Sequence, residues 1–354
     1  MRFLIVVLAF FTVWPAMAAA PVYREIRDFV VACDNTRACR VLGFPEGGGE
    51  YLILDLRRDA GPAGKAVLRL SASRRFAASE FRLDGRPSTL SALPWRDAGS
   101  QDEGALELRD ADAIEDFVDL VRNGGALTTG RGESLTVLSL SGFSAALLLV
   151  DDAQGRLDTQ TAWLRRGTKP AASVPPADAL PVLPATPKAP PPLSQAQGRQ
   201  LIAAIRRQQA ALMKAEECDE ANDISPDQVF ALDGDEALLL LNCITGAYQS
   251  AGFAFRVPRD GKGPAKRIAL QAPVRINGDS GRIDWFINGD YDPATAMLSH
   301  FAKGRGLADC GEAASWRYDG RDFKLASYES LGRCGGMGPG DWPTLYRTSA
   351  GKAR

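Results

Sequence analysis

Six cysteines are the residues whose type and spacing most directly imply chemistry in this sequence of 354 residues. They form three close pairs: Cys33 with Cys39, Cys218 with Cys243, and Cys310 with Cys334. Such thiols either form disulfides or bind zinc, but the sequence has no C-x-x-C motif and a single histidine, His300. We therefore expect three disulfides rather than a zinc site. The sequence alone does not fix their connectivity, and we favour the local pairs because each then falls within one predicted domain.

Residues 142–146 partly match the G-x-S-x-G elbow, in which a hydrolase places its serine nucleophile between a strand and a helix. Ala146 replaces the last glycine of that motif, and the base would have to be His300 in the other predicted lobe. Ser141 or Ser144 capping the following helix, with Gly142 allowing the turn, explains the same residues more simply. We therefore predict a helix cap, and we expect His300 to be a packing or surface residue.

Carboxylates cluster in two predicted loops, Asp233 with Asp235 and Asp290 with Asp292. Calcium takes six to eight oxygen ligands, so these four residues are weak calcium candidates. Neither loop has the spacing of an EF-hand, and aspartate is also an ordinary turn residue. Paired carboxylates could also serve glycoside hydrolysis, which requires a set distance between them that the sequence does not give. We assign no catalytic residue and no cofactor.

Two local enrichments are predicted to be structural. The glycine-rich residues 47–49 and 335–340 lack the lysine and hydroxyl residue of a phosphate-binding loop, so we expect ordinary loops. Aromatic residues are dense after residue 284, and we expect most of them in the core.

The first 18 residues have the composition of a secretory signal peptide. Arg2 precedes the apolar residues 3–14, a run shorter than the roughly 20 residues that span a bilayer. Residues 16–18, Ala-Met-Ala, form a small-x-small cleavage site. We therefore predict removal of residues 1–18 and a periplasmic mature protein, in a compartment where disulfides persist. No later segment is apolar enough to predict a membrane span.

A proline-rich segment divides the remaining chain. Residues 169–193 contain nine prolines in twenty-five positions, so they cannot form a helix or an interior strand. We predict a polyproline II linker between an N-terminal lobe, residues 19–168, and a C-terminal lobe, residues 194–354. Such a linker would let the lobes move independently, or would lie along the surface of docked lobes.

Short alternating runs dominate both predicted lobes, and each lobe has one or two helices. The fold class is therefore α+β, dominated by antiparallel sheet. Helices are predicted from Asp110 or Asp112 to the glycines at 124–125, over 144–151, and from a capping box at Ser194 to about Glu217. Asp319-Gly320 between two runs predicts a hairpin with a two-residue turn.

Several stretches resemble a known family: residues 32–40 (ACDNTRACR), 59–62, 138–147 (LSLSGFSAAL), 151–156, 303–311 and 341–346. They resemble an exported bacterial family catalogued as domain of unknown function 1176. The N-terminal lobe is also similar to the invasion-associated locus B proteins, through its paired cysteines and residues 138–147. The first resemblance implies export without an assigned activity. The second implies an envelope protein linked to host-cell interaction, and neither supplies catalytic residues.

The charges nearly balance, with 42 Lys and Arg against 43 Asp and Glu, and give no electrostatic footprint for nucleic acid or an anionic membrane. Export, disulfides and the missing active-site motif together favour a non-enzymatic binding protein of the cell envelope. Its partner would be an envelope protein or a cell-wall component. Two alternatives stay open: an inhibitor of a cell-wall lytic enzyme, and a hydrolase that uses Ser144 or the loop carboxylates.

Overall fold

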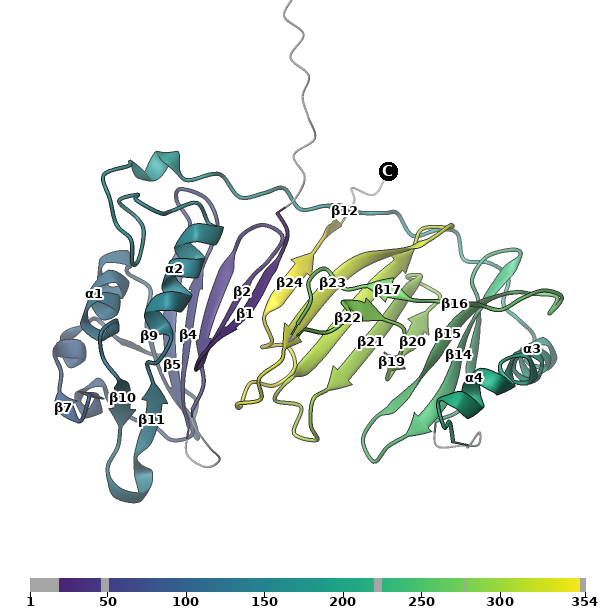
Figure 1. Ribbon diagram of the computed structural model, residues 1–354, viewed down its shortest axis with the longest axis horizontal. Helices are drawn as coiled ribbons and strands as arrows, with labels where there is room; N and C mark the ends of the chain where they lie inside the picture. The colour runs from purple at the N-terminus through teal and green to yellow at the C-terminus, as the bar shows by residue number, and fades with distance from the viewer. Residues whose placement is uncertain (1–18, 46–50, 220–224, 277, 351–354) are drawn as a thin grey trace, which may run out of the picture.

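The computed structural model describes residues 19–45, 51–219, 225–276 and 278–350 (Figure 1). The predicted signal peptide, residues 1–18, and the glycine segment 47–49 lie outside these residues. The described chain is α+β, as the sequence predicts, with mostly antiparallel strands and four α-helices. Within these ranges, no helix is both long and apolar enough to cross a membrane.

A seven-stranded antiparallel sheet forms the N-terminal half, with the order β1-β2-β3-β4-β5-β9-β8. Its strands are β1 (Val22–Ile26), β2 (Phe29–Cys33), β3 (Cys39–Gly43), β4 (Leu52–Arg58), β5 (Ala66–Ala72), β8 (Arg96–Asp97) and β9 (Gly104–Leu108). Strands β1 to β5 pair in sequence order, because short turns suffice to connect antiparallel neighbours.

Two helices, α1 (Ala111–Val121) and α2 (Phe143–Ala153), cover one face of this sheet (Figure 1). Asp110 begins α1 by accepting a hydrogen bond from the Ala113 amide at 3.0 Å, which confirms the predicted cap. Smaller elements complete this half: β6 (Arg82–Leu83), β7 (Arg86–Pro87), β10 (Ala126–Thr129) and β11 (Thr136–Ser139) in one sheet, with 3-10 turns η1 (Ala78–Glu80), η2 (Thr89–Ala92) and η3 (Gly132–Ser134).

The C-terminal half contains two larger antiparallel sheets and a small one. The first comprises β13 (Gln228–Ala231), β14 (Glu236–Thr245), β15 (Ser250–Pro258), β16 (Lys266–Arg267) and β19 (Phe286–Ile287). The second comprises β20 (Asp290–Asp292), β21 (Met297–Lys303), β22 (Gly311–Tyr318), β23 (Phe323–Leu331) and β24 (Thr344–Arg347), and β17 (Leu270–Gln271) pairs with β18 (Arg282–Ile283). Helices α3 (Gln195–Gln208) and α4 (Ala210–Ala215) pack on the first sheet through Leu201, Ile205 and Met213.

One hydrophobic cluster joins the two halves. Successive residues of a strand point to opposite faces, so Phe29 and Val31 of β2 pack under the helices while Val30 and Ala32 point the other way. Val30 and Ala32 belong to a buried cluster shared with the C-terminal half, whose largest members are Tyr23, Phe44, Phe286, Tyr291, Trp316, Tyr318, Tyr328 and Trp342. Hydrogen bonds cross the same junction, including Gly332 N to Tyr23 Oη at 2.7 Å. The halves are therefore packed against each other.

The proline-rich residues 169–193 run over the surface past this junction (Figure 1). After the 3-10 turn η4 (Ala171–Ser173), they contribute β12 (Val182–Leu183), which pairs in parallel with β25 (Ser349–Ala350) near the chain end. Arg317 Nη1 also donates to the Pro184 carbonyl at 3.1 Å. The segment thus lies along the packed halves, one of the two arrangements that the sequence allows.

The structure corrects two local predictions. The helix expected from Ser194 to about Glu217 has the predicted capping box, but Gln209 divides it into α3 and α4. The Asp319-Gly320 hairpin forms at the expected place, but Tyr318 pairs with Phe323, so its loop has four residues, 319–322, rather than two. The Asp319 carboxylate stabilises this longer loop by accepting from the amides of Arg321 and Asp322.

Three disulfides are present, Cys33–Cys39, Cys218–Cys243 and Cys310–Cys334. These are the local pairs favoured by the spacing, and no described cysteine is free. Cys33–Cys39 joins the end of β2 to the start of β3, close to residues 340–347 of the C-terminal half.

Candidate binding groove at the junction

Two adjoining hollows, which we call the junction groove, lie where the first sheet meets the C-terminal half. One has a volume of about 270 Å³ and lies between the Cys33–Cys39 loop and residues 340–347. The other, of about 420 Å³, lies between β4 and β5 and the glycine-rich residues 336–338. Arg57 and Asp341 line both hollows, so the two adjoin at these side chains. Its size suits a small ligand or a few residues of a chain.

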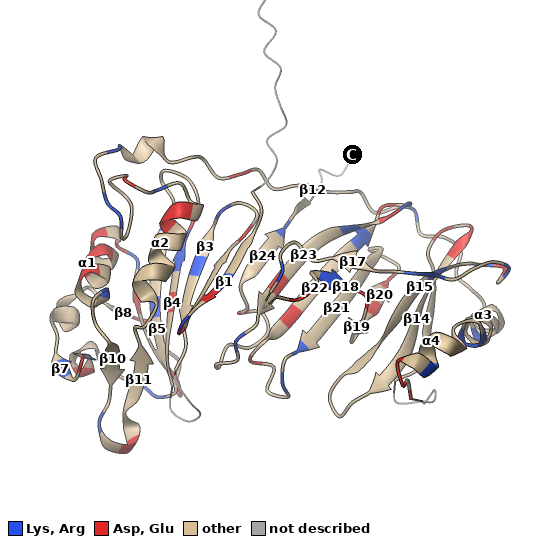
Figure 2. Cartoon of the chain, in the orientation of Figure 1, with Lys and Arg blue, Asp and Glu red and all other residues tan. Residues whose placement is uncertain are grey.

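The strand pattern explains why this groove is charged. In β4, Leu52, Leu54 and Leu56 pack under the helices, which leaves Asp55 and Arg57 on the face toward the groove. Figure 2 marks both charge signs on strands β3 to β5. Residues 336–341 of the C-terminal half face this part of the sheet across a hollow, so Arg57 remains exposed whereas Asp55 is buried.

Asp55 organises the guanidinium groups at the centre of the groove. Its carboxylate accepts from Arg40 at 2.8 and 2.9 Å, and from Arg57 at distances down to 2.7 Å. Burial of Asp55 opposes its ionisation, but the charges and hydrogen bonds of Arg40 and Arg57 outweigh burial and lower its pKa. Arg40 also reaches across the junction, where its Nη1 donates to the Asp341 carbonyl at 2.6 Å.

Two half-exposed arginines supply positive charge with spare hydrogen-bonding capacity. Arg57 binds Asp55 through Nε and Nη2, and Arg347 binds Asp34 and Thr36 through Nε and Nη2. The side chains of Arg57 and Arg347 are 53% and 48% exposed. Neither Nη1 has a hydrogen-bond partner among the described residues, so each can donate to a ligand carboxylate.

Two carboxylates line the same hollow and supply negative charge. Asp59 and Asp341 make no side-chain hydrogen bond or ion pair within the described ranges. Burial opposes ionisation of the Arg57 guanidinium, but the hydrogen bond and charge of Asp55 outweigh burial and raise its pKa. The charge of Asp341 adds to this rise. The groove therefore presents unsatisfied donors and acceptors of opposite charge side by side.

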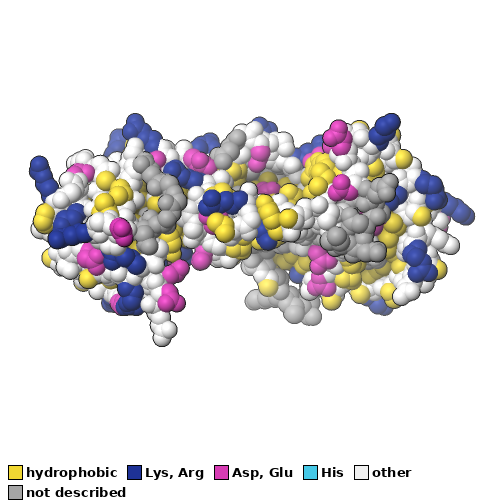
Figure 3. All heavy atoms as spheres, turned by 90° about the horizontal axis from the view of Figure 1, so that it is seen from below, with side chains coloured by type: hydrophobic (Ala, Val, Ile, Leu, Met, Phe, Trp, Pro, Cys, Tyr) yellow, Lys and Arg dark blue, Asp and Glu magenta, His cyan; other side chains and the backbone are white. Residues whose placement is uncertain are grey.

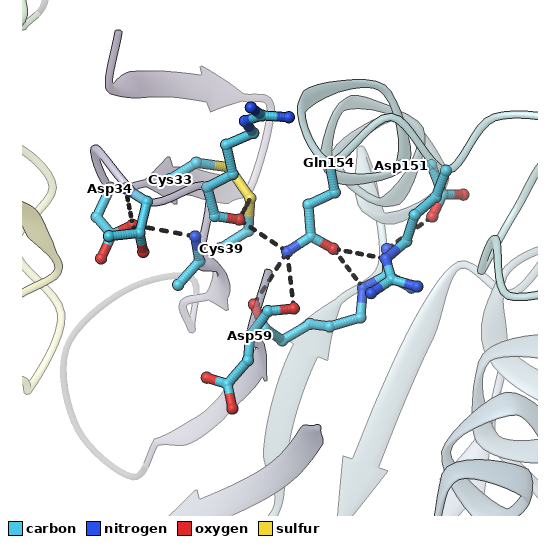
Figure 4. Close-up of a disulfide and its surroundings, with 11 residues drawn as sticks. Cys33, Asp34, Cys39, Asp59, Asp151 and Gln154 are labelled. Atoms are coloured by element: carbon cyan, nitrogen blue, oxygen red, sulfur yellow. Dashed lines mark hydrogen bonds and ion pairs between the residues drawn. A yellow bond between two sulfur atoms is a disulfide. The ribbon is translucent and has the colours of Figure 1, made fainter. Parts of the chain in front are cut away.

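A buried polar network holds the rim of the groove beneath the Cys33–Cys39 disulfide (Figure 4). The Gln154 side-chain amide donates to the carbonyls of Arg37, Arg58 and Asp59 at 2.9–3.3 Å. Arg58 pairs with the fully buried Asp151 at 2.8 Å and stacks on Trp163, 3.6 Å from the ring centroid. Burial lowers the pKa of Arg58 to about 10, against the opposing charge of Asp151. This network fixes the loop and strand that present Asp34, Arg40 and Asp59.

Ser144 and His300 are not brought together. Ser144 lies in the first turn of α2, where its hydroxyl donates to the Arg122 carbonyl at 2.7 Å. The predicted serine cap is wrong: Gly142, with φ of 95°, occupies the N-cap position, and no side chain caps this helix. Ser144 instead ties the start of α2 to the end of α1.

His300 lies in the other half, on β21, and is 3% exposed. Its Nδ1 accepts from the Ile287 amide at 3.1 Å, so Nε2 carries the proton and donates to Glu312 at 3.0 Å. Tyr328 donates to the other Glu312 oxygen at 2.7 Å. Burial opposes ionisation of Glu312, but its bonds with His300 and Tyr328 lower its pKa. Figure 3 shows no histidine on the face it presents, which agrees with this burial.

Two of the four calcium candidates, Asp233 and Asp292, stabilise turns through their carboxylates. Asp233 accepts from the amides of Asp235 and Glu236 and from the Tyr318 hydroxyl, and Asp292 accepts from Ala294 and Thr295. No side-chain bond of Asp235 or Asp290 is formed within the described ranges. In that part of the chain, the single group of three or more close Cys, His, Asp or Glu ligands is Asp309 with the bonded Cys310 and Cys334.

Four of the six stretches that resemble the family meet around the groove. Residues 32–40, 59–62 and 151–156 build the disulfide loop and its supporting network, and residues 341–346 form the opposite wall. Arg57 and Arg347, which lie outside these stretches, could not be recognised from sequence. The available signal for Arg57 was the alternation of leucine with charged residues in β4, and β24 carries no comparable pattern around Arg347.

Comparisons with known proteins agree with this resemblance. The family model described as "Protein of unknown function (DUF1176)" matches residues 23–349. A curated relative, the uncharacterized protein YpfG of Escherichia coli strain K12, is 33% identical over 359 aligned residues, which cover 98% of this chain and 100% of the relative. No solved structure matches with significance. The chain belongs to the DUF1176 family.

Proposed function

We propose that this protein is an exported, non-catalytic binding protein of the cell envelope, and that its junction groove binds a short peptide-like ligand. The observation that carries the proposal is the pairing of spare arginine donors, on Arg57 and Arg347, with the unsatisfied carboxylates of Asp59 and Asp341. A ligand with both a carboxylate and an ammonium group would satisfy both sets.

The cell wall offers ligands of this chemistry, because its stem peptides carry free carboxylates and amines. The signal-peptide pattern of residues 1–18 and the three disulfides support a location where these peptides occur. The hydrolase alternative receives no support from Ser144, whose hydroxyl is bound to Arg122, or from the buried His300.

Titration calorimetry of the mature protein with purified stem peptides tests the proposal. We expect binding, and about tenfold weaker binding for each of Arg57→Ala and Arg347→Ala, because each removes one charged donor. Arg86→Ala, an exposed arginine of β7 away from the groove, serves as the matched control and should bind as wild type. Acetylated, amidated peptides should bind less well than peptides with free charges. Absence of binding, or equal affinity of all variants, would refute the proposal.

A further inference from the structure

The Asp178 carboxylate of the proline-rich segment lies next to Ala19, the residue that follows the predicted cleavage site. The backbone nitrogen of Ala19, the first described residue, lies 3.3 Å from Oδ2 of Asp178. Asp178 is the single acidic residue among positions 169–193. We propose that cleavage after Ala18 creates an α-ammonium group that Asp178 binds, and that this ion pair fastens the proline-rich segment to the N-terminal half.

Cleavage would strengthen the contact between the Ala19 nitrogen and Asp178, because it turns a neutral amide into a charged amine. Hydrolysis of the Ala18–Ala19 peptide bond adds one water, leaves a carboxylate on Ala18, and leaves an amine on Ala19 that takes up a proton. The nitrogen thereby changes from a neutral amide with one N–H to an ammonium group with three. An α-amine with an ordinary pKa near 8 is charged at neutral pH, and charge-assisted hydrogen bonds are roughly twice as strong as neutral ones.

Asp178 is held in place to receive this charge. Arg37 donates from Nε to Oδ2 at 2.7 Å and from Nη2 to Oδ1 at 2.8 Å, and the Asp178 side chain is only 12% exposed. Arg37 is itself fixed, because its carbonyl accepts from Gln154 in the network under the disulfide. A carboxylate accepts about four hydrogen bonds, so Oδ2 has room for the ammonium group beside Arg37.

The position of Asp178 gives the ion pair a structural consequence. Upstream, Val174 is buried against the N-terminal half, and downstream, the Pro181 carbonyl accepts from Ser349 N of the C-terminal half at 2.9 Å. Asp178 therefore lies where the segment passes from one half to the other. Without its ion pairs, residues 178–180 would depend on the Pro181 bond and on the packing of residues 175–177 beside Gly155 and Gly61.

A double-mutant cycle on the full mature chain tests the proposal. One chain begins at Ala19 and the other carries Gly-Ser before Ala19, which keeps the Ala19 amide but moves the charge away. Each is prepared with Asp178 and with Asp178→Asn, and Asp102→Asn, an exposed loop aspartate, is the control. The rate of cleavage by elastase, which has a small specificity pocket and can cut after Ala177 or Ala179, reports release of the segment.

We expect the Gly-Ser extension to speed cleavage about fivefold with Asp178 and to have no effect with Asp178→Asn. Asp102→Asn should leave the effect of the extension unchanged. An equal effect of the extension in both backgrounds, or none in either, would overturn the ion pair. Mass spectrometry of the exported protein should find Ala19 at the N-terminus, and a different first residue would overturn the proposed cleavage.

Discussion

Strands β1 to β3 and strands β4 to β5 share one face of the same sheet, yet the two parts of this face have different chemistry. The first part, together with Phe44 just after β3, presents Tyr23, Val30, Ala32 and Leu42, which are buried under the C-terminal half, and has Arg40 at its edge toward β4. The second part presents Asp55, Arg57, Arg69 and Ser71, which line the junction groove. The change from apolar to charged residues marks the edge of the packed interface, and it places a polar groove beside that interface.

The largest expected effect comes from the covered part. Phe44→Ala removes a fully buried ring that packs across the junction, and should lower the free energy of unfolding by about 3–5 kcal/mol. Arg69→Ala, on the open part of the same face, should change it by less than about 1 kcal/mol. Urea denaturation measures both values. Similar losses for the two variants would mean that the covered and open parts do not differ as described.

The next effect concerns the buried carboxylate at the boundary. Asp55→Asn should cost about 3 kcal/mol, because it leaves Arg40 and Arg57 without their shared anion. Since the pKa of Asp55 is lowered in the folded state, its contribution is present above the unfolded pKa of about 4 and is lost as pH falls through the folded value.

Unfolding measured from pH 7 down to pH 2.5 checks this sign. The stability difference between wild type and Asp55→Asn should be constant above about pH 5 and should shrink below pH 4. Asp102→Asn is the matched control, because that residue is exposed in a loop. A difference that grows on acidification would contradict the described role of Asp55.

A smaller effect should distinguish two glycines of the 335–340 loop. A Cβ at Gly335 would collide with the Phe44 ring, whereas a Cβ at Gly338 would meet open space. Gly335→Ala should therefore destabilise the protein by about 1–3 kcal/mol, and Gly338→Ala should be nearly neutral. Thermal unfolding of the two variants measures the difference. Equal melting temperatures would show that the loop does not pack on the N-terminal half as described.

Local patterns made much of the fold predictable. The cap at Asp110 and the apolar spacing of α1 depend on residues within one helix, and the cysteine pairs are separated by 6 to 25 positions. The groove depends instead on contacts between distant positions, such as Arg347 with Asp34, which are 313 apart. The alternation of Leu and charged residues in β4 indicates one polar face, but it does not reveal what lies opposite. The predicted serine cap is wrong because Gly142 occupies the N-cap position of α2, and the Ser144 hydroxyl donates to the Arg122 carbonyl instead.

We expect the shared hydrophobic cluster, rather than the proline-rich segment, to hold the two halves together around the groove. A site-specific protease site placed at residues 185–189 and cleaved without reductant tests it most directly, because no disulfide links residues 19–184 to the rest of the chain. We expect the cleaved protein to elute from a sizing column as one particle of unchanged size. Elution as two separate fragments would show that the halves need the intact proline-rich segment to stay together.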